Sequence, residues 1–454
     1  MKNKKIGTFA PISALMSKDL SPSDEGTFAV GKAFLHWLNQ TKQSAWQVLP
    51  LHETQLEKDS VTKHVPSPYK SYGVGLSPRY LPESFATRIP TEEERSAFLL
   101  HQQSWIGDYA LFCSLRDHFK TDDWRQWDKS IRNYQPEARL FWQEKLQKEM
   151  SFYVTQQWQV HQAYKELRDQ AKHADILLIG DLPFYPSLQS PLVWAHQDIF
   201  QINADGSMPF VSGIPDMAGT HFGRQIWGHP LYQWKRQEDV VAFWKLRLDY
   251  LVELFDWVRF DHVRGFFSYG EIDPENEARD IYRDGPGGEV LEELVAYSHK
   301  IGLYIFVEDS GEEVPALRIS LKKLHIPGIK IIRFMLKNKN HSVHRGSEET
   351  VAYTTTHDTE TLVGYLHKVK PYRKQLLATL AHVRYSPYDK IFAARLRDGL
   401  LASRAQIVLI PLQDWLLLKE RINTPGTERE VDDPNWRFRL QIPIEELPRN
   451  LIKD

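Results

Sequence analysis

The chain has 454 residues, of which 42% are apolar, and it carries 14 Trp, 19 Tyr and 22 Phe. This is enough apolar material for one large core or for several ordinary domains. The formal net charge of −2 argues against the basic balance that is typical of proteins binding nucleic acid or acidic membrane surfaces. The single cysteine, Cys113, lies in an apolar segment and cannot form an internal disulfide. We therefore expect a buried, inert thiol and a cytoplasmic protein.

The first residues combine lysines with a short apolar run, as a secretory leader does. Pro11 interrupts that run, and residues 6–12 are needed as the first strand of the fold described next. No segment reaches the roughly 18 apolar residues of a membrane span. The sequence therefore predicts a soluble protein with no membrane partner and no nucleic-acid partner.

Eight short β-like runs follow one another along the chain, and most of them end in polar or charged residues. They occupy residues 6–13, 46–51, 176–181, 257–261, 303–309, 329–334, 351–358 and 407–414. Helical patterns separate most of these runs, for example at residues 290–300, where Gly302 provides a C-cap. Eight strands that alternate with helices predict an α/β protein with a (β/α)8 TIM barrel. A doubly wound sheet could hold the same strands, but it would spread their charged ends along a line.

Two connections are too long for simple crossovers. Residues 52–173 carry several helix-like segments, which predicts a helical subdomain inserted after the second strand. Residues 182–240 are rich in Pro, Gly and aromatic residues without clear periodicity, which is typical of a lid or binding loop after the third strand. We therefore expect a single catalytic barrel over residues 1–454 with these two insertions.

The segment WVRFDHVRG, residues 257–265, shows most clearly how the strands present charged groups. It follows a helical pattern with apolar residues three or four positions apart, which are Val241, Trp244, Leu248, Leu251 and Phe255. A short buried strand then places Asp261, His262 and Arg264 at its carboxyl end, where α/β barrels carry catalytic groups. A buried ion pair between Arg259 and Asp261 would explain part of this pattern without any catalysis.

Acidic residues end four of the predicted strands, namely Asp181, Asp261, Glu308 and Asp358. The carboxyl ends of barrel strands meet at one mouth, so we expect these carboxylates to converge. Clustered carboxylates repel one another, and at least one should hold a proton near neutral pH. A proton donor beside an ionised carboxylate is what cleavage of a glycosidic bond requires.

Other chemistries have less support. No Gly-rich phosphate loop, GxSxG elbow or HExxH motif occurs in the sequence. A metal site remains an alternative, because the Asp261–His262, His357–Asp358 and Glu308–Asp309 pairs could supply ligands. Aromatic residues in the 182–240 insertion favour sugar chemistry instead, since sugars stack their C–H faces on such rings. We expect neither a metal nor an organic cofactor.

Thirteen short segments in order along nearly the whole chain carry a specific resemblance. They include AWQVLPL (45–51), LIGDLPFY (178–185), IWGHPLYQW (226–234), VRFDHVRGF (258–266), TTHDTETLVGY (355–365) and NWRFR (435–439). In these segments the chain resembles the amylomaltases, the 4-α-glucanotransferase family of the α-amylase clan. The resemblance implies a retaining transfer of part of an α-1,4-glucan to the 4-hydroxyl of glucose or another glucan, through a covalent glycosyl-aspartate. It also implies a monomer or homodimer.

The resemblance further implies a role for individual residues. Asp261 matches the family's nucleophile, Glu308 its acid/base, and Asp358 the carboxylate that holds the 2- and 3-hydroxyls of the transferred sugar. Sugar contacts are expected from Arg259, His262, His357, Asp181, Gln225, Trp227, Asn435, Trp436, Ser67 and Tyr69. We expect Arg259 to keep Asp261 ionised, and Asp358 to raise the pKa of Glu308 so that it can donate a proton.

The segment GIPDMAGTHFG, residues 213–223, departs from the family's Pro-Pro-Asp-Tyr loop by lacking the second Pro and the Tyr. We therefore expect some hydrolytic leakage, with transfer still dominant. An α-1,4-glucan hydrolase of the same clan is the main alternative. A metal-dependent barrel enzyme and a glucan-binding protein without catalysis are weaker ones.

Overall fold

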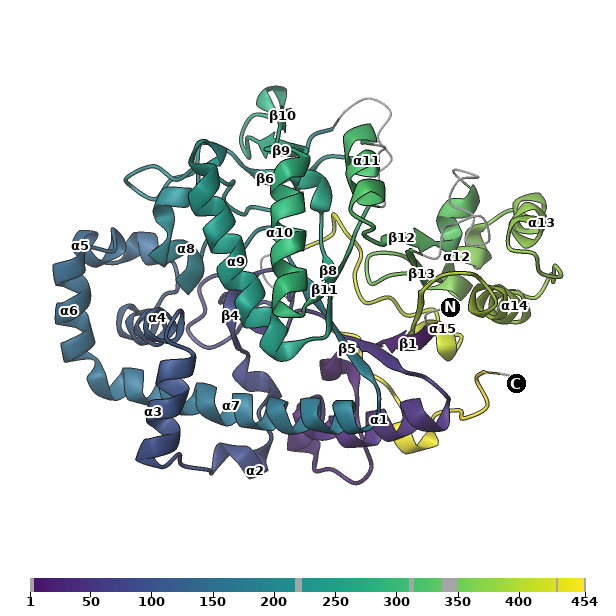
Figure 1. The fold of residues 1–454 in the computed structure, drawn as a ribbon, viewed down its shortest axis with the longest axis horizontal. Helices are drawn as coiled ribbons and strands as arrows, with labels where there is room; N and C mark the ends of the chain where they lie inside the picture. Colours follow the sequence, from purple (N-terminus) through teal and green to yellow (C-terminus); the bar gives the residue numbers. More distant parts are fainter. Residues whose placement is uncertain (1–3, 217–222, 310–313, 337–348, 430–431, 453–454) are drawn as a thin grey trace.

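The computed structural model describes residues 4–216, 223–309, 314–336, 349–429 and 432–452, and it is built around a closed barrel of parallel strands (Figure 1). The barrel strands are β1 (Lys5–Phe9), β2 (Ala45–Gln47), β5 (Leu177–Leu182), β8 (Trp257–Phe260), β11 (Tyr304–Val307), β12 (Gly328–Ile331), β13 (Thr350–Tyr353) and β14 (Ile407–Pro411). They pair in the order β1-β14-β13-β12-β11-β8-β5-β2, and β2 closes the ring on β1. Within the described residues, no helix combines the length and the apolar character needed to cross a membrane.

The predicted (β/α)8 barrel is confirmed, because each of the eight predicted segments overlaps one barrel strand. Most predicted segments run beyond the carboxyl end of the strand. The predicted run 351–358, for example, gives a strand that ends at Tyr353, where its register with β12 and β14 also ends. The residues past these ends form the loops of the barrel mouth, and they carry most of the charged groups discussed below.

An outer ring of helices surrounds the barrel (Figure 1). The helices that connect successive strands are α1 (Gly31–Gln40), α7 (Gln147–His173), α9 (Gln237–Leu254), α10 (Gly288–Ile301), α11 (Pro315–Lys323), α12 (Leu362–Lys368), α13 (Pro371–Leu380) and α14 (Asp389–Leu401), and α15 (Leu412–Trp415) follows the last strand. The C-cap of α10 is Gly302, as predicted, with a left-handed φ of 87°. Only a residue without a Cβ adopts this conformation readily.

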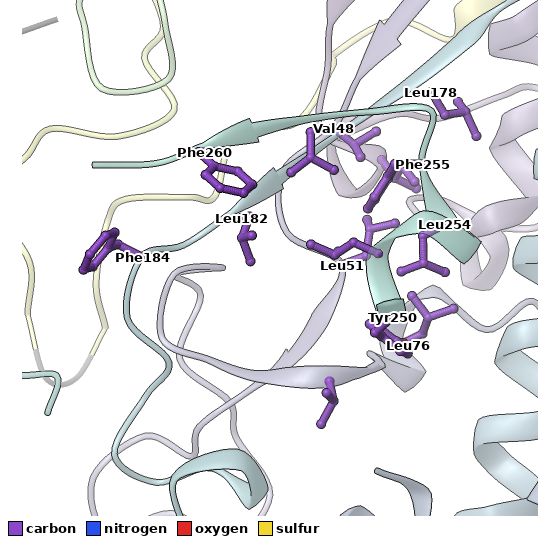
Figure 2. Close-up of a cluster of buried hydrophobic side chains, with 14 of the residues drawn as sticks. Val48, Leu51, Leu76, Leu178, Leu182, Phe184, Tyr250, Leu254, Phe255 and Phe260 are labelled. Carbon is purple, nitrogen blue, oxygen red and sulfur yellow. The ribbon is translucent and has the colours of Figure 1, made fainter. Parts of the chain in front are cut away.

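Helix α9 and strand β8 show how the sequence pattern becomes packing. Val241, Trp244, Leu248 and Leu251 are buried, as their spacing predicts, while Phe255 already lies beyond the helix as an extended C-cap. Figure 2 shows side chains from the end of α9 packed with outward-facing residues of the barrel strands, Leu182 and Phe260 among them. Burying each such side chain contributes about 1.5–3 kcal/mol, so this layer fixes β8 against its helix.

The first long connection, residues 52–173, contains both a small sheet and helices. Its elements before α7 are β3 (His52–Thr54), β4 (Ser71–Leu76), α2 (Glu83–Ala86), α3 (Glu92–His101), α4 (Ile106–Phe119), α5 (Lys129–Arg132) and α6 (Pro136–Lys145). Helix α7 joins this region to the barrel, because Gln157 binds the backbone of Leu76 while Leu167 lies against Gly31 of α1. The division of the chain into subdomains stays a prediction.

The second connection takes part in a sheet that the sequence patterns did not indicate. Its short helix is α8 (Pro191–Ala195), and its strands are β6 (Val211–Ile214) and β7 (Gln225–Ile226). They pair with β9 (Ser268–Ile272) and β10 (Ile281–Asp284), which follow β8, in the order β10-β9-β6-β7. Glycines make the close approach possible, since a Cβ on Gly270 would lie 2.3 Å from the carbonyl oxygen of Gly213. Residues 217–222 of the divergent 213–223 loop lie outside the described residues.

Candidate active site

The alternation of side chains along the strands directs the charged groups into the barrel. In β5 and β8, Ile179 and Trp257 face the interior cluster, so Asp181 and Arg259, two residues further on, share that side. Asp181 and Arg259 are also direct partners in the register of these strands. Asp261 and Glu308 follow the ends of β8 and β11, and their backbone N–H groups still donate to the neighbouring strands at Leu182 and Phe260.

Arg259 joins three of the four predicted carboxylates. Its Nη1 donates to both carboxylate oxygens of Asp181, at 2.9 and 2.8 Å. Its Nη2 lies 2.9 Å from Asp261 Oδ1 and 3.2 Å from Glu308 Oε2. The Arg259 side chain is only 4% exposed, whereas Asp261 and Glu308 are 22% and 25% exposed. One buried cation therefore holds two carboxylates that solvent, and hence a substrate, can reach.

The pKa values of Asp261 and Glu308 are shifted in the directions opposite to those expected, since that of Asp261 is raised and that of Glu308 is lowered. Burial raises the pKa of Asp181 and that of Asp261, and in both cases Arg259 opposes the rise. Burial also acts to raise the pKa of Glu308, but Arg259 and then His262 outweigh it, so the pKa of Glu308 is lowered. The backbone N–H of His262 donates to Glu308 Oε2 at 3.2 Å. The expectation that Asp358 sets a raised pKa on Glu308 is therefore wrong for this arrangement, because Arg259 also reaches Glu308. The expectation that Arg259 keeps Asp261 ionised is not met either, since burial outweighs Arg259 and holds the pKa of Asp261 well above its usual range.

The fourth carboxylate, Asp358, is held by a histidine and an asparagine. Asp358 Oδ2 lies 3.0 Å from His357 Nε2, and Asn423 Nδ2 donates to Asp358 Oδ1 at 2.6 Å. Burial raises its pKa, but His357, Asn423 and Arg259 together lower it to about 2. Tyr69 connects this group to the arginine cluster, because its hydroxyl donates to Asp181 at 2.7 Å and lies 2.9 Å from His357 Nε2. All four predicted carboxylates are thus brought to one place.

Aromatic rings line one side of this cluster. The ring of Tyr69 is stacked on that of His357 with centroids 5.4 Å apart, and Trp436 lies 5.5 Å from Tyr69 and 5.6 Å from His357. Trp436 has a positive φ of 65°, and its backbone N–H donates to Ile422. Within the described part of the chain, the buried Nε1 of Trp436 has no hydrogen-bond partner. It is a polar donor at the edge of the mouth.

Trp227 and Gln225 lie at the part of the site that carries His262. The Trp227 ring meets that of His262 edge to face at 4.7 Å, and its Nε1 donates to Gln225 Oε1 at 3.0 Å. His262 has a left-handed φ of 48°, which turns the chain directly after Asp261. Burial lowers the pKa of His262 to about 4, so its ring is neutral at pH 7. The predicted contact residues of the 182–240 insertion therefore lie against the strand end that carries Asp261.

Asn435 and Ser67 are placed differently from the other predicted contacts. Asn435 Oδ1 accepts from the backbone N–H of Thr424, and its Nδ2 donates to Thr427 Oγ1, so its amide already ties one loop to another. Ser67 is buried, and its carbonyl accepts from Lys70 N in the turn that presents Tyr69. Their roles as sugar contacts stay predictions.

Asn423 is a site residue that the sequence patterns did not single out. It lies in the irregular segment after β14, and its backbone N–H donates to the carbonyl of His357. Arg421, two residues earlier, donates to the carbonyl of Asp358. Asn423 belongs to RINTPGT, residues 421–427, which is one of the thirteen segments that carry the resemblance. That segment could have pointed to Asn423, but nothing in the sequence indicated its contact with Asp358.

The strand-end acids do not all face the mouth. Asp309 follows Glu308 but points to the other side, where it accepts from Ile329 N at 2.8 Å and lies 3.0 Å from Arg318. Among the described residues, no group of three or more His, Cys, Asp and Glu side chains is placed to hold a metal ion. The arrangement is a cluster of carboxylates around one arginine, bordered by aromatic rings, and it suits acid–base and nucleophilic chemistry on a sugar.

The fold and the carboxylate cluster together define a barrel enzyme of the kind that rearranges glycosidic bonds. A family model described as 4-alpha-glucanotransferase matches residues 76–445. The chain belongs to this family, and it is a 4-alpha-glucanotransferase acting on α-1,4-glucans.

Individual relatives agree with this assignment. The chain is 29% identical to the 4-alpha-glucanotransferase of Aquifex aeolicus, with 92% of this chain and 93% of that protein covered. It is 31% identical to the plastid 4-alpha-glucanotransferase of Solanum tuberosum, over 74% of this chain and 58% of that protein. The solved amylomaltase of Streptococcus agalactiae in complex with acarbose shares the fold, with a TM-score of 0.84 at 24% identity and 99% and 97% coverage.

Proposed function

We propose that the enzyme transfers part of an α-1,4-glucan with retention of configuration, through a covalent glycosyl ester on Asp261. The observation that carries this proposal is that Asp261 and Glu308 both contact the same nitrogen, Arg259 Nη2. Asp261 Oδ1 lies 2.9 Å and Glu308 Oε2 lies 3.2 Å from that nitrogen, so these two oxygens are no more than about 6 Å apart. Retaining enzymes hold their carboxyl groups at about 5–5.5 Å, whereas inverting enzymes need roughly 6.5–9.5 Å to admit water.

The two half-reactions use the same pair of residues. In the first, a carboxylate oxygen of Asp261 attacks the anomeric carbon, the glycosidic C–O bond breaks, and Glu308 gives its proton to the leaving 4-oxygen. In the second, Glu308 takes the proton from the 4-hydroxyl of an acceptor sugar, whose oxygen attacks the anomeric carbon and displaces Asp261. Asp358, ionised at neutral pH, accepts hydrogen bonds from two hydroxyls of the transferred sugar.

Glu308 must hold a proton before it can act as an acid. The contact between Arg259 and Glu308, at 3.2 Å, is longer than the one to Asp261 at 2.9 Å. A leaving-group oxygen at Glu308 would compete with Arg259 for this carboxyl. Loss of that contact leaves burial as the dominant influence, which raises the pKa of Glu308. We infer that substrate binding breaks the Arg259–Glu308 contact and leaves Arg259 on Asp261. Glu308 then holds the proton, and Asp261 is ionised.

Transfer requires that an acceptor competes with water for the glycosyl ester. Water is present at about 55 M, and a sugar held in attack geometry can reach an effective molarity of roughly 10⁵ M or more. The rings of Trp227, beside His262, and of Trp436, beside Tyr69, border the mouth and suit stacking on a sugar. The acarbose bound by the Streptococcus agalactiae amylomaltase supports an oligosaccharide ligand for this fold.

Incubation with maltotriose tests transfer against hydrolysis. A transferase yields glucose and a ladder of longer maltooligosaccharides, with little net gain in reducing ends. Because the 213–223 segment lacks the family's tyrosine, some hydrolytic leakage is expected. Reducing ends that rise in step with maltotriose consumption, with no product longer than the substrate, would instead show the hydrolase that is the alternative function.

Substitution of Asp261 by Asn tests the covalent step. An amide cannot form the glycosyl ester, so Asp261→Asn should abolish turnover while the thermal unfolding midpoint stays close to that of the unsubstituted protein. More than a few per cent of residual activity, with deamidation excluded by mass spectrometry, would contradict the role of Asp261. A cytoplasmic location and a monomeric or dimeric state stay predictions.

A further inference from the structure

A hollow of about 560 Å³ lies beside the catalytic mouth, with Trp436 in the wall that it shares with the site. The side chains of four arginines line it, which are Arg79, Arg116, Arg437 and Arg439. Phe152 and Tyr153, from the first turns of α7, form part of its apolar wall. Its volume is in the range of small-molecule sites, roughly 300–1,000 Å³.

One of the four arginines is neutralised within the protein. The Arg116 side chain is 9% exposed, and its Nη1 lies 2.8 Å from Glu53 Oε1 while its Nε lies 3.1 Å from Asp117. A second contact of the Glu53 carboxylate goes to His64, at 3.4 Å. This pair therefore contributes little net charge to the hollow.

Of the other three arginines, Arg437 is the one that the described residues pair with a carboxylate. Arg437 lies 3.9 Å from Glu57 and donates through Nε to a backbone carbonyl. Arg79 donates to the Tyr80 hydroxyl, and among the described residues no carboxylate lies within 4.0 Å of Arg79 or Arg439. Arg79 and Arg439 both line the hollow, and both are exposed to solvent.

Two like charges facing one hollow are stabilised by an anion between them. Guanidinium groups bind phosphate oxygens through paired hydrogen bonds, and they do so better than they bind neutral hydroxyls. A neutral glucan could stack on Phe152, which is 58% exposed, but it would leave the charge of Arg79 and Arg439 unmatched. A ligand that suits both features has a phosphate and a sugar ring.

We propose that this hollow binds a phosphorylated sugar, with the phosphate held by Arg79 and Arg439 and the ring against Phe152 and Trp436. The phosphate could belong to a free monosaccharide phosphate or to a phosphate group on a glucan chain. The site is separate from the catalytic carboxylates and adjoins them through Trp436, whose ring also packs on Tyr69 and His357. The proposed binding of a phosphorylated sugar does not depend on which reaction the carboxylates perform.

Calorimetric titration of the whole protein with glucose 6-phosphate, glucose and inorganic phosphate tests the proposal. Glucose 6-phosphate should bind at least about tenfold more tightly than either of the others, because it alone engages both walls. In the double variant Arg79→Gln/Arg439→Gln, its Kd should rise by roughly tenfold or more. Arg404→Gln, at an exposed arginine before β14, is the matched control and should leave the Kd unchanged.

Three results would overturn the proposal. The first is equal affinity for glucose 6-phosphate and glucose, and the second is binding of inorganic phosphate alone as tightly as the sugar phosphate. The third is a double variant with an unchanged thermal midpoint that binds glucose 6-phosphate as the native protein does. A parallel titration with a phosphorylated maltooligosaccharide identifies the source, since tighter binding of the longer ligand assigns the phosphate to a glucan and tighter binding of glucose 6-phosphate assigns it to a free sugar.

Discussion

Replacement of Arg259 by Met is the most informative perturbation of the catalytic cluster. Arg259 contacts Asp181 at 2.8 Å, Asp261 at 2.9 Å and Glu308 at 3.2 Å, and it is almost completely buried. A positive charge favours the ionised form of a neighbouring carboxyl, so its removal raises the pKa of all three. Asp261 must be ionised to attack, and activity is therefore lost as the pH falls through the raised pKa.

The size of the shift follows from the geometry. Unit charges about 4 Å apart interact by roughly 4 kcal/mol at an effective dielectric constant near 20. One pKa unit corresponds to about 1.4 kcal/mol, so loss of Arg259 should move the acidic limb of the pH profile upward by about 2–3 units. The measurement is kcat/KM for glucose release from maltotriose between about pH 4 and 10.

A lysine variant separates the charge of Arg259 from its shape. Arg259→Lys keeps a cation but cannot bridge three carboxylates, so its acidic limb should move less than that of Arg259→Met while kcat still falls. Removing one partner of a buried ion pair costs about 3–5 kcal/mol, so both variants are compared by thermal unfolding and circular dichroism. A folded Arg259→Met protein whose acidic limb stays within about half a unit of the original would refute the electrostatic role of Arg259.

Three further predictions concern other parts of the molecule. Asn423→Ala removes the 2.6 Å hydrogen bond to Asp358, and because such a bond to a charged group contributes about 1.5–3 kcal/mol, kcat/KM on maltotriose should fall by roughly 10–100-fold; an unchanged value would contradict its place in the site. Gly180→Ala adds a Cβ 2.3 Å from the Phe255 ring and should cost about 1–3 kcal/mol in urea unfolding, whereas Gly107→Ala in α4, with no atom within 4 Å, should be neutral or slightly stabilising. Exhaustive EDTA treatment should leave transfer activity intact, and loss that a divalent ion restores would revive the metal-dependent alternative.

The barrel itself was predictable because its signals are local. The spacing of apolar residues predicts a buried strand or an amphipathic helix directly. Helix α9 buries Trp244 and Leu248, as that spacing requires. Within a strand the period is two, so Asp181 shares a side with Ile179, and Arg259 shares a side with Trp257. The convergence of these groups with Asp261 and Glu308 then follows from the parallel arrangement of the strands.

Other features depend on residues that are distant in the sequence, and only the tertiary structure decided them. The sheet of β6, β7, β9 and β10 joins two separate connections, and the bond from Asn423 to Asp358 spans 65 positions. The protonation pattern is of the same kind, because the pKa of Glu308 depends on how one guanidinium divides its contacts between two carboxylates about 6 Å apart or less. Periodicity and motifs indicate which groups reach the mouth. Electrostatic coupling between them weakens with distance and strengthens with burial, and both are set only when the chain has packed.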